Sequence, residues 1–266
     1  MHRSTPTGPP LTVSVVIPVK NDAELLDRCL RALHRQTRPA DEIIVVDNGS
    51  TDSSAAVATS RGARVVRCDE PGIPAASAAG YDAATGDLIL RLDADCLPAE
   101  TWVQAAAVAF VRHPRVSVFT GAARFIDGPR ALRTPLATAY LVAYAVATIP
   151  ALGHLPLFGS NLAFRRSAWR SVSARVHRDD PELHDDLDLA FHLGERHRIR
   201  YLADAPMGMS MRPFRDAQAF AHRFRRGFRT VTIHWPDDFP PLRWVRLALR
   251  RILHRLRIPT PTQALR

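Results

Sequence analysis

Apolar and polar residues alternate in blocks along the first 113 residues of the chain. Four runs are rich in valine, isoleucine and leucine, and they lie at residues 11–19, 42–46, 64–68 and 88–92. The first run has no clean alternation of apolar and polar positions, which predicts a strand covered on both faces. The other three runs predict a second, a third and a fourth strand.

Segments with helical features separate these runs. Helices are predicted after Asp22, from Thr51 or Asp52, around residues 75–84, and from Pro98 to Val111. Strands and helices that alternate four times with short connections predict an α/β fold with right-handed crossovers. The expected architecture is a doubly wound, mostly parallel sheet.

Polar residues follow three of the predicted strands, at Pro18–Asn21, Asp47–Ser50 and Asp93–Asp95. In sheets of this kind, ligands bind beyond the carboxyl ends of the strands. The three polar segments are therefore expected to converge on one edge of the sheet and to form the binding site.

Asp93 and Asp95 follow the fourth apolar run as an Asp-x-Asp pair. Alternate side chains of an extended segment share a face, so the two carboxylates should lie on the same rim. Carboxylates this close repel each other unless a cation lies between them, and Mg²⁺ or Mn²⁺ completed by substrate phosphates fits that need. The alternative is a solvated aspartate pair in a turn.

A second acidic cluster lies at residues 184–188, His-Asp-Asp-Leu-Asp. Asp180 and Pro181 predict the start of the helix that carries it, since proline is favoured in a first turn. The helix dipole explains part of this charge. A carboxylate of this cluster is also a candidate general base if the fold brings it close to the first pair.

The composition is that of an ordinary globular protein, but the charge is unevenly distributed. The 266 residues are 46% hydrophobic and 23% charged, which excludes a disordered tail, a collagen-like fibre and a small disulfide scaffold. The net charge of +10 belongs to residues 212–266, which hold 13 arginines and 3 aspartates, whereas residues 1–211 are neutral. Such a basic segment predicts a negatively charged partner, either nucleic acid or anionic lipid.

The end of the basic segment has an amphipathic pattern. One predicted helical face is apolar and holds Leu242, Val245, Leu249, Ile252, Leu253 and Leu256. The other is cationic and holds Arg243, Arg246, Arg250, His254 and Arg257. This pattern is typical of a helix that lies on a membrane surface, so we expect peripheral attachment to the inner leaflet. The alternative is a cationic helix packed on its own domain or on a dimer partner.

Three further features concern location. Residues 1–10 are polar and proline-rich, which predicts a disordered lead-in and no signal peptide. The uncharged segment Thr134–Phe164 is alanine-rich and interrupted by prolines, which predicts a buried or membrane-facing helix and not a membrane span. The cysteines, Cys29, Cys68 and Cys96, are widely spaced, so we expect buried thiols in a reducing cytoplasm.

The motifs taken together resemble family 2 glycosyltransferases of the GT-A fold. The matching segments run in the family's order from about residue 12 to residue 193: residues 15–22, 44–52, 86–95, 159–166 and 184–189. The resemblance implies a nucleotide-diphospho-sugar transferase in which residues 11–211 form the catalytic domain. Within it, residues 11–113 are the nucleotide-binding half and residues 114–211 the acceptor half, followed by the basic helical region 212–266.

The resemblance also implies a role for individual residues. The nucleotide sugar is expected to contact Pro18, Val19, Asn21, Asp47, Asn48, Asp93 and Ala94. Asp95, with Asp93, is expected to bind the divalent cation, and the acceptor is expected near Gly159, Ser160 and Asn161. Asp186 matches the family's catalytic base, next to Asp185 where glutamate is more usual. The implied reaction is metal-assisted, inverting transfer to a hydroxyl acceptor, with a lipid-linked or cell-envelope glycan as one candidate.

The chain departs from the family pattern at several places. Residues 76–80, Ala-Ser-Ala-Ala-Gly, lack the arginine and asparagine that many members carry there, and His192 stands where arginine is common. The Gln-x-x-Arg-Trp motif of processive synthases is missing, which argues against a polymerase. Arg223, Arg225 or Arg226 is therefore a candidate for contacting the diphosphate.

Other functions fit the sequence less well. A haloacid-dehalogenase-type phosphatase needs a hydroxyl residue at position 97 and a downstream lysine, but Leu97 is apolar and the single lysine, Lys20, lies upstream. A nucleotidyltransferase needs a glycine-rich loop, and residues 18–21 hold no glycine. The interpretation as a nucleic-acid-binding module is supported only by the basic segment, so we do not expect nucleic acid as a partner. An inactive GT-A-like scaffold is the remaining alternative.

Overall fold

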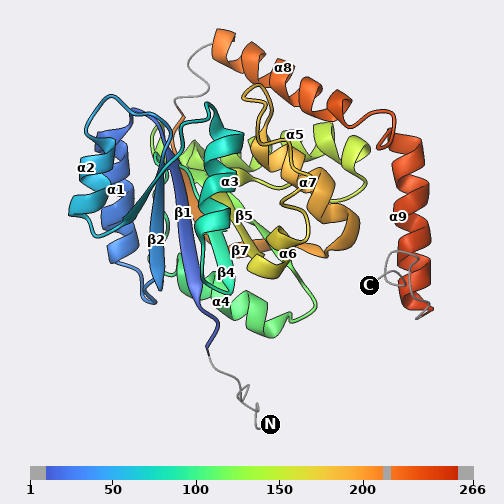
Figure 1. Ribbon diagram of the computed structural model, residues 1–266, viewed down its shortest axis with the longest axis horizontal. Coiled ribbons are helices and arrows are strands. Elements are labelled where there is room, and N and C mark those ends of the chain that lie inside the picture. The colour runs from blue at the N-terminus through green and yellow to red at the C-terminus, as the bar shows by residue number, and fades with distance from the viewer. Residues whose placement is uncertain (1–9, 212–216, 257–266) are drawn as a thin grey trace.

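The computed structural model describes residues 10–211 and 217–256 of the chain (Figure 1). The expected lead-in at residues 1–10, Pro10 excepted, and Arg257 lie outside these ranges. The predicted boundary between residues 211 and 212 lies at the end of the first described range, so the structure does not test it.

A seven-stranded sheet runs through the described part of the chain in the order β3-β2-β1-β4-β6-β5-β7. The strands are β1 (Val13–Val19), β2 (Glu42–Asp47), β3 (Arg64–Arg67), β4 (Leu88–Arg91), β5 (Val118–Phe125), β6 (Leu162–Arg165) and β7 (Ile199–Met209). The first four are parallel, and β6 runs antiparallel between β4 and β5. The prediction of a mostly parallel, doubly wound sheet is confirmed.

Helices cover both faces of the sheet (Figure 1). On one face lie α1 (Ala23–His34), α2 (Ser54–Ser60) and α4 (Trp102–Arg112), and on the other lie α3 (Ile73–Ala83), α6 (Arg166–Arg170) and α7 (Asp185–Arg196). Strand β1 shows why no alternation was visible in the sequence. Val15 and Ile17 enter one hydrophobic core, Val16 enters the other, and all three are fully buried.

Two helices begin later than the sequence predicted. Helix α4 begins at Trp102 and not at Pro98, because Leu97 is held extended by a backbone bridge to Gly208. Helix α7 begins at Asp185 and not after Asp180, whose carboxylate instead accepts hydrogen bonds from the Glu182 amide and from Arg229. The acidic cluster therefore forms the first turn of α7.

The uncharged segment forms α5 (Arg133–Leu152), and most of this helix is not buried. The helix with its leading turn, Arg130–Leu152, is long and apolar enough to cross a membrane, and 22% of its most apolar stretch is buried inside the protein. Val142 and Val146 are 55% and 68% exposed. The expectation of a buried helix is therefore wrong for most of α5, and its alternative, a membrane-facing helix, fits the exposed side chains.

The basic region forms α8 (Ala217–Ile233) and α9 (Pro240–Arg255). Helix α8 lies across α7, and α9 turns down along the edge of the molecule (Figure 1). The cationic face of α9 packs inward: Arg243 is fully buried and donates hydrogen bonds to the carbonyls of Leu152 and Phe191, and Arg250 forms an ion pair with Glu195 at 2.7 Å. The apolar face points outward.

Candidate functional site

The expected rim of polar residues forms at the carboxyl ends of β1, β2 and β4. Because β6 runs antiparallel to β4, its amino end lies at this same edge, and Arg91 is paired with Leu162 across the two strands. The 3-10 turn η2 (Gly159–Asn161) just before β6 therefore lies beside the Asp-x-Asp segment. The first turn of α7 completes the site.

Arg91 lies at the centre of the site, and it is 3% exposed. Its Nη2 atom is 2.9 Å from Asp93 Oδ1 and 3.3 Å from Asp185 Oδ2, so it joins the end of β4 to the start of α7. Burial alone would lower the pKa of Arg91, but the carboxylates of Asp185 and Asp93 raise it, so the guanidinium stays charged. One buried cation therefore holds both acidic clusters together.

Gly159 gives Arg91 the space that it needs. A Cβ atom at Gly159 would lie 1.7 Å from Arg91 Nη1, a separation that no pair of unbonded heavy atoms tolerates. The Gly159 amide also donates a 2.9 Å hydrogen bond to Asp186 Oδ2. The glycine of the Gly-Ser-Asn segment is thus required by close packing between β4 and α7.

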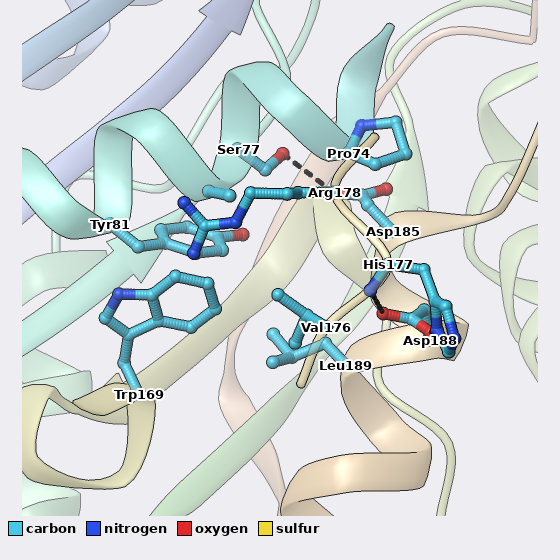
Figure 2. A pocket seen from close by; sticks show the side chains of 11 residues that line it. Pro74, Ser77, Tyr81, Trp169, Val176, His177, Arg178, Asp185, Asp188 and Leu189 are labelled. Carbon is cyan, nitrogen blue, oxygen red and sulfur yellow. Dashed lines mark hydrogen bonds and ion pairs between the residues drawn. The ribbon is translucent and has the colours of Figure 1, made fainter. Parts of the chain in front are cut away.

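The two aspartates that begin α7 differ in their surroundings. Asp185 accepts a 2.8 Å hydrogen bond from the Ser77 hydroxyl of α3, which Figure 2 shows, in addition to its ion pair with Arg91. Asp186 accepts only backbone amides in the hydrogen bonds that the structure defines for it, those of Gly159 and Leu187. Burial, and then the neighbouring Asp185 carboxylate, raise the pKa of Asp186. Part of its surface still reaches solvent.

Asp93 and Asp95 fit a hard divalent cation. Their carboxylates, with the Cys96 thiol, offer ligand atoms within 4.8 Å of one another. Cys96 is buried, and burial followed by the two aspartates raises the pKa of its thiol, which leaves a neutral, poor ligand. The donors that remain are carboxylate oxygens, the kind that Mg²⁺ and Mn²⁺ prefer. The Ser160 hydroxyl orients Asp93 through a 2.5 Å hydrogen bond to Oδ2.

The loops after β1 and β2 are joined to each other by hydrogen bonds at the rim. Asn21 has a left-handed backbone with a φ of 52°, and its side-chain oxygen accepts a 2.7 Å hydrogen bond from the Thr51 amide. Asp47 accepts a 3.0 Å hydrogen bond from the Ser50 amide. These bonds fix the shape of the loops before any ligand arrives.

Several residues expected at the site point away from it. The Asn161 side chain is buried and bonds to Trp102 and to the carbonyls of Ala122 and Ala205, so it supports the fold and does not face an acceptor. Asn48 likewise turns inward and holds the loop that follows β3. Pro18, Val19 and Ala94 are also buried.

The three candidate arginines of α8 are placed differently from one another. Arg226 donates to the carbonyls of Pro181 and Leu183 and so is committed to the loop before α7. Arg225 lies 3.8 Å from Glu182. Arg223 is exposed. Its positive charge lowers the pKa of Tyr140, which burial and then the Asp186 carboxylate raise. Of the three, Arg223 is the best positioned to meet a ligand.

Sequence reasoning missed Arg91, Tyr140 and Tyr144. The signal for Arg91 was an arginine inside an apolar strand, Leu-Ile-Leu-Arg-Leu, where a charge needs a partner. The tyrosines lie on the inner side of α5, and the pKa of Tyr144 is raised by burial and then by Asp186. The Tyr144 hydroxyl is buried and has no hydrogen-bond partner among the residues that the structure describes. No pattern within the uncharged segment distinguished these two residues.

Comparison with known proteins agrees with this geometry. Residues 14–171 match the model of the family described as glycosyl transferase family 2. Glycosyltransferase AglE of Haloferax volcanii is 35% identical over 100 residues, which cover 35% of this chain and 33% of that protein. Undecaprenyl-phosphate 4-deoxy-4-formamido-L-arabinose transferase of Sodalis glossinidius is 42% identical over 93 residues, 31% of this chain and 28% of that protein. The chain thus spans a third or less of these curated relatives.

Solved structures share the fold at low sequence identity. Glucosyl-3-phosphoglycerate synthase of Mycobacterium tuberculosis, solved with uridine diphosphate, has a TM-score of 0.56 at 21% identity over 94% of this chain and 82% of that one. A further structure of that enzyme holds Mn²⁺, uridine diphosphate and glucosyl-3-phosphoglycerate. TarS of S. aureus has a TM-score of 0.61 at 16% identity over 84% of this chain and 39% of that one.

Proposed function

The chain belongs to glycosyl transferase family 2 and has the GT-A fold, and from this we propose that it transfers a sugar from a nucleotide-diphosphate sugar to a hydroxyl acceptor. The transfer inverts the anomeric carbon. The single observation that carries the proposal is the ion-pair network of Arg91, which brings Asp93 of the donor half against Asp185 of the acceptor half.

The donor half would hold the nucleotide and the cation. Asn21 and Asp47 would contact the nucleoside, and Asp95 with Asp93 would ligate Mg²⁺ or Mn²⁺. Such an ion, when bound, neutralises the charge of the diphosphate leaving group. Arg223 is the candidate for a further contact to that charge, since it is exposed and its backbone carbonyl lies 2.9 Å from the ring of His184, the residue before Asp185.

Asp186 is the better candidate for the general base. It would take the proton of the acceptor hydroxyl while the hydroxyl oxygen attacks the anomeric carbon. A carboxylate with a raised pKa is a stronger base than an exposed one, and Asp186 holds no ion pair shorter than 4.0 Å among the described residues. Asp185, which is bound to Arg91 and Ser77, would instead position Arg91.

The acceptor is proposed to be lipid-linked. Tyr140 and Tyr144 of α5 face the Asp186 side of the site, whereas Val142 and Val146 of the same helix are exposed. Helix α5 therefore has one side next to Asp186, the proposed general base, and an apolar side that faces outward. The name of the relative from Sodalis glossinidius contains undecaprenyl-phosphate, which supports a lipid carrier in the acceptor, with a hydroxyl of the carried group as the proposed nucleophile. On this proposal the enzyme acts at the cytoplasmic face of a membrane.

Nucleotide-sugar binding with and without Mn²⁺ tests the donor half. A panel of uridine-, guanosine- and thymidine-diphosphate sugars should yield one donor whose affinity, measured by calorimetry, depends on the metal. Asp95→Ala should weaken that binding at least about tenfold, because it removes a ligand from the cation. The matched control is Asp69→Ala. Asp69 is exposed, follows the carboxyl end of β3 and forms an ion pair with Arg67. No metal-dependent binding across the panel would contradict the proposal.

Transfer to an undecaprenyl-phosphate-linked or similar lipid acceptor tests the acceptor half. Asp186→Asn should lower kcat by about 10²–10⁴-fold, the usual contribution of a general base, and leave donor affinity nearly unchanged. An inactive scaffold would bind no donor, or would bind it without transfer in the native chain. Full transfer by Asp186→Asn would show that the base is a different residue.

A further inference from the structure

Three histidines and one aspartate converge behind the first turn of α7. Asp188 Oδ1 lies 2.7 Å from His177 Nδ1, 3.1 Å from His234 Nε2 and 3.7 Å from His192 Nε2. The four groups offer ligand atoms within 4.8 Å of one another. They are separate from the Asp-x-Asp pair, although Asp188 lies on the same helix as the acceptor-side aspartates.

The four residues come from three segments of the chain. Asp188 and His192 lie one turn apart on α7, His177 lies in the loop before that helix, and His234 follows the end of α8. Figure 2 shows the His177 ring directed at the Asp188 carboxylate. His234 is the distant member, and it joins the other three because the basic region packs on α7.

Hydrogen bonding alone does not satisfy this cluster. His192 Nε2 is buried and has no hydrogen-bond partner within the described ranges, because the carboxylate oxygen that the other two rings contact lies 3.7 Å away. A buried ring nitrogen without a partner lowers the stability of the fold unless a ligand binds it. An ion among the rings would supply that partner.

We propose that His177, Asp188, His192 and His234 form a structural Zn²⁺ site. Three imidazole nitrogens and one carboxylate oxygen make up a four-coordinate donor set of borderline hardness, which suits Zn²⁺ better than Mg²⁺ or Ca²⁺. All four ligands come from the protein, as in closed structural sites. The site therefore differs in chemistry and purpose from the Asp93 and Asp95 pair.

The surroundings of the ligands support this assignment. The second oxygen of Asp188 accepts a 3.0 Å hydrogen bond from the His177 amide, which orients the carboxylate. His234 Nδ1, the ring nitrogen opposite the cluster, lies 3.8 Å from Asp238. Such outer contacts fix the direction of ligands in metal sites. His177 is about one-third exposed, which leaves an ion a path from solvent.

Zn²⁺ would fasten the basic region to the catalytic domain. His234 lies between α8 and α9, and Asp188 lies one turn from Asp185, so one ion would clamp these helices to α7 next to the acceptor-side carboxylates. The ion would stabilise the folded chain by a free energy that grows with the logarithm of its affinity, because the complete ligand set exists only in the folded state.

Metal titration of the full chain tests this site without any assay of activity. After treatment with a chelator and gel filtration, the protein should bind one equivalent of Zn²⁺, measured by elemental analysis. Co²⁺ added in its place should produce the intense visible absorption of a four-coordinate ion. His192→Ala and His234→Ala should each weaken Zn²⁺ binding by at least about 100-fold and remove the rise in Tm that Zn²⁺ gives the native chain.

Controls separate this site from the catalytic one and from general effects. His197→Ala, at the end of α7 outside the cluster, should keep one equivalent of Zn²⁺, and so should Asp95→Ala. If His234→Ala does not fold, His177→Ala on the exposed loop replaces it. Binding of less than about 0.1 equivalent by the native chain would overturn the proposal, as would equal binding by His192→Ala.

Discussion

Arg91 is a charged residue in the middle of a hydrophobic sheet, and its position depends on carboxylates that come from distant parts of the chain. Asp93 is two residues away, but Asp185 belongs to a helix that begins 94 positions later. A buried guanidinium is stable only when its charge is balanced nearby. The two acidic clusters therefore stabilise the fold as well as serving the proposed chemistry.

Replacing Arg91 by leucine should lower the free energy of unfolding by about 3–5 kcal/mol, because two partly buried carboxylates would lose their cation. Urea denaturation followed by circular dichroism measures this change. Arg31→Leu is the matched control, since Arg31 forms a 2.5 Å ion pair with Asp27 while it is half exposed. An exposed pair of that kind contributes less than about 1 kcal/mol. Equal losses in the two variants would contradict the role given to Arg91.

At the scale of residues, the sequence predicted the carboxylates of the site better than their partners. Asp93, Asp95, Asp185 and Asp186 stood out because acids cluster after a strand and before a helix. The direction of a side chain was not predictable for Asn48 or Asn161. Both lie in turns, where a change in the backbone conformation of one residue decides whether the side chain points to solvent or to the core. Their buried hydrogen bonds depend on segments that are distant in the sequence, the loop after β3 for Asn48 and strand β7 for Asn161.

At the scale of elements, Glu42 holds the opposite edge of the sheet together. This first residue of β2 accepts hydrogen bonds from the Ser14 hydroxyl of β1 and from the amides of Thr85 and Gly86 before β4. Burial would raise the pKa of Glu42, but these hydrogen bonds outweigh it and lower the pKa. Three neighbouring strands are thus joined through one carboxylate.

Glu42→Gln should destabilise the native chain at pH 7 by about 1–3 kcal/mol, the usual cost of weakening hydrogen bonds to a charged group. A lowered pKa in the folded state means that this stabilisation is complete above the ordinary glutamate pKa of about 4.3 and is lost as the pH falls through the folded value.

Urea denaturation of both proteins between pH 7 and pH 3 tests this dependence. The difference in unfolding free energy between the native chain and Glu42→Gln should shrink as the pH falls. Glu100→Gln, at an exposed turn, should differ little from the native chain at any pH. A difference for Glu42→Gln that stays constant with pH would exclude the ionised carboxylate as its cause.

The number and order of the early strands and helices were predictable, but the exact starts of α4 and α7 were not. Proline is favoured in the first turn of a helix, yet Pro98 and Pro181 both precede their helices by several residues. In each case a long-range contact prevails over the local preference: the bridge from Leu97 to Gly208, and the bond from Arg229 to Asp180.

At the scale of the whole molecule, the amphipathic helix α9 is oriented with its arginines inward. The sequence separated the two faces correctly but not their directions, because either face can find partners. Leu242, Val245, Leu249, Ile252 and Leu256 are between 51% and 63% exposed. Val142 and Val146 of α5 are exposed as well, so large apolar side chains face outward from both helices.

The double variant Leu249→Asp/Ile252→Asp should lose binding to vesicles of anionic phospholipid, because it places two charges in the proposed contact surface. Co-sedimentation measures the bound fraction, which should fall at least about fivefold. Val111→Asp on α4, an exposed valine on the opposite side of the sheet, should bind as the native chain does. Unchanged binding by the double variant would exclude α9 as the contact.

Strand β6 also limits how the molecule can move. It pairs with β4 on one side and with β5 on the other, so the segments that carry Asp93 and Ser160 share one ladder of backbone hydrogen bonds. Two lobes on a hinge can open around a substrate, but halves built on a common sheet cannot do so without breaking that ladder. Any opening of the proposed donor site must therefore come from parts outside the sheet, and α8, which lies across α7, is one of them.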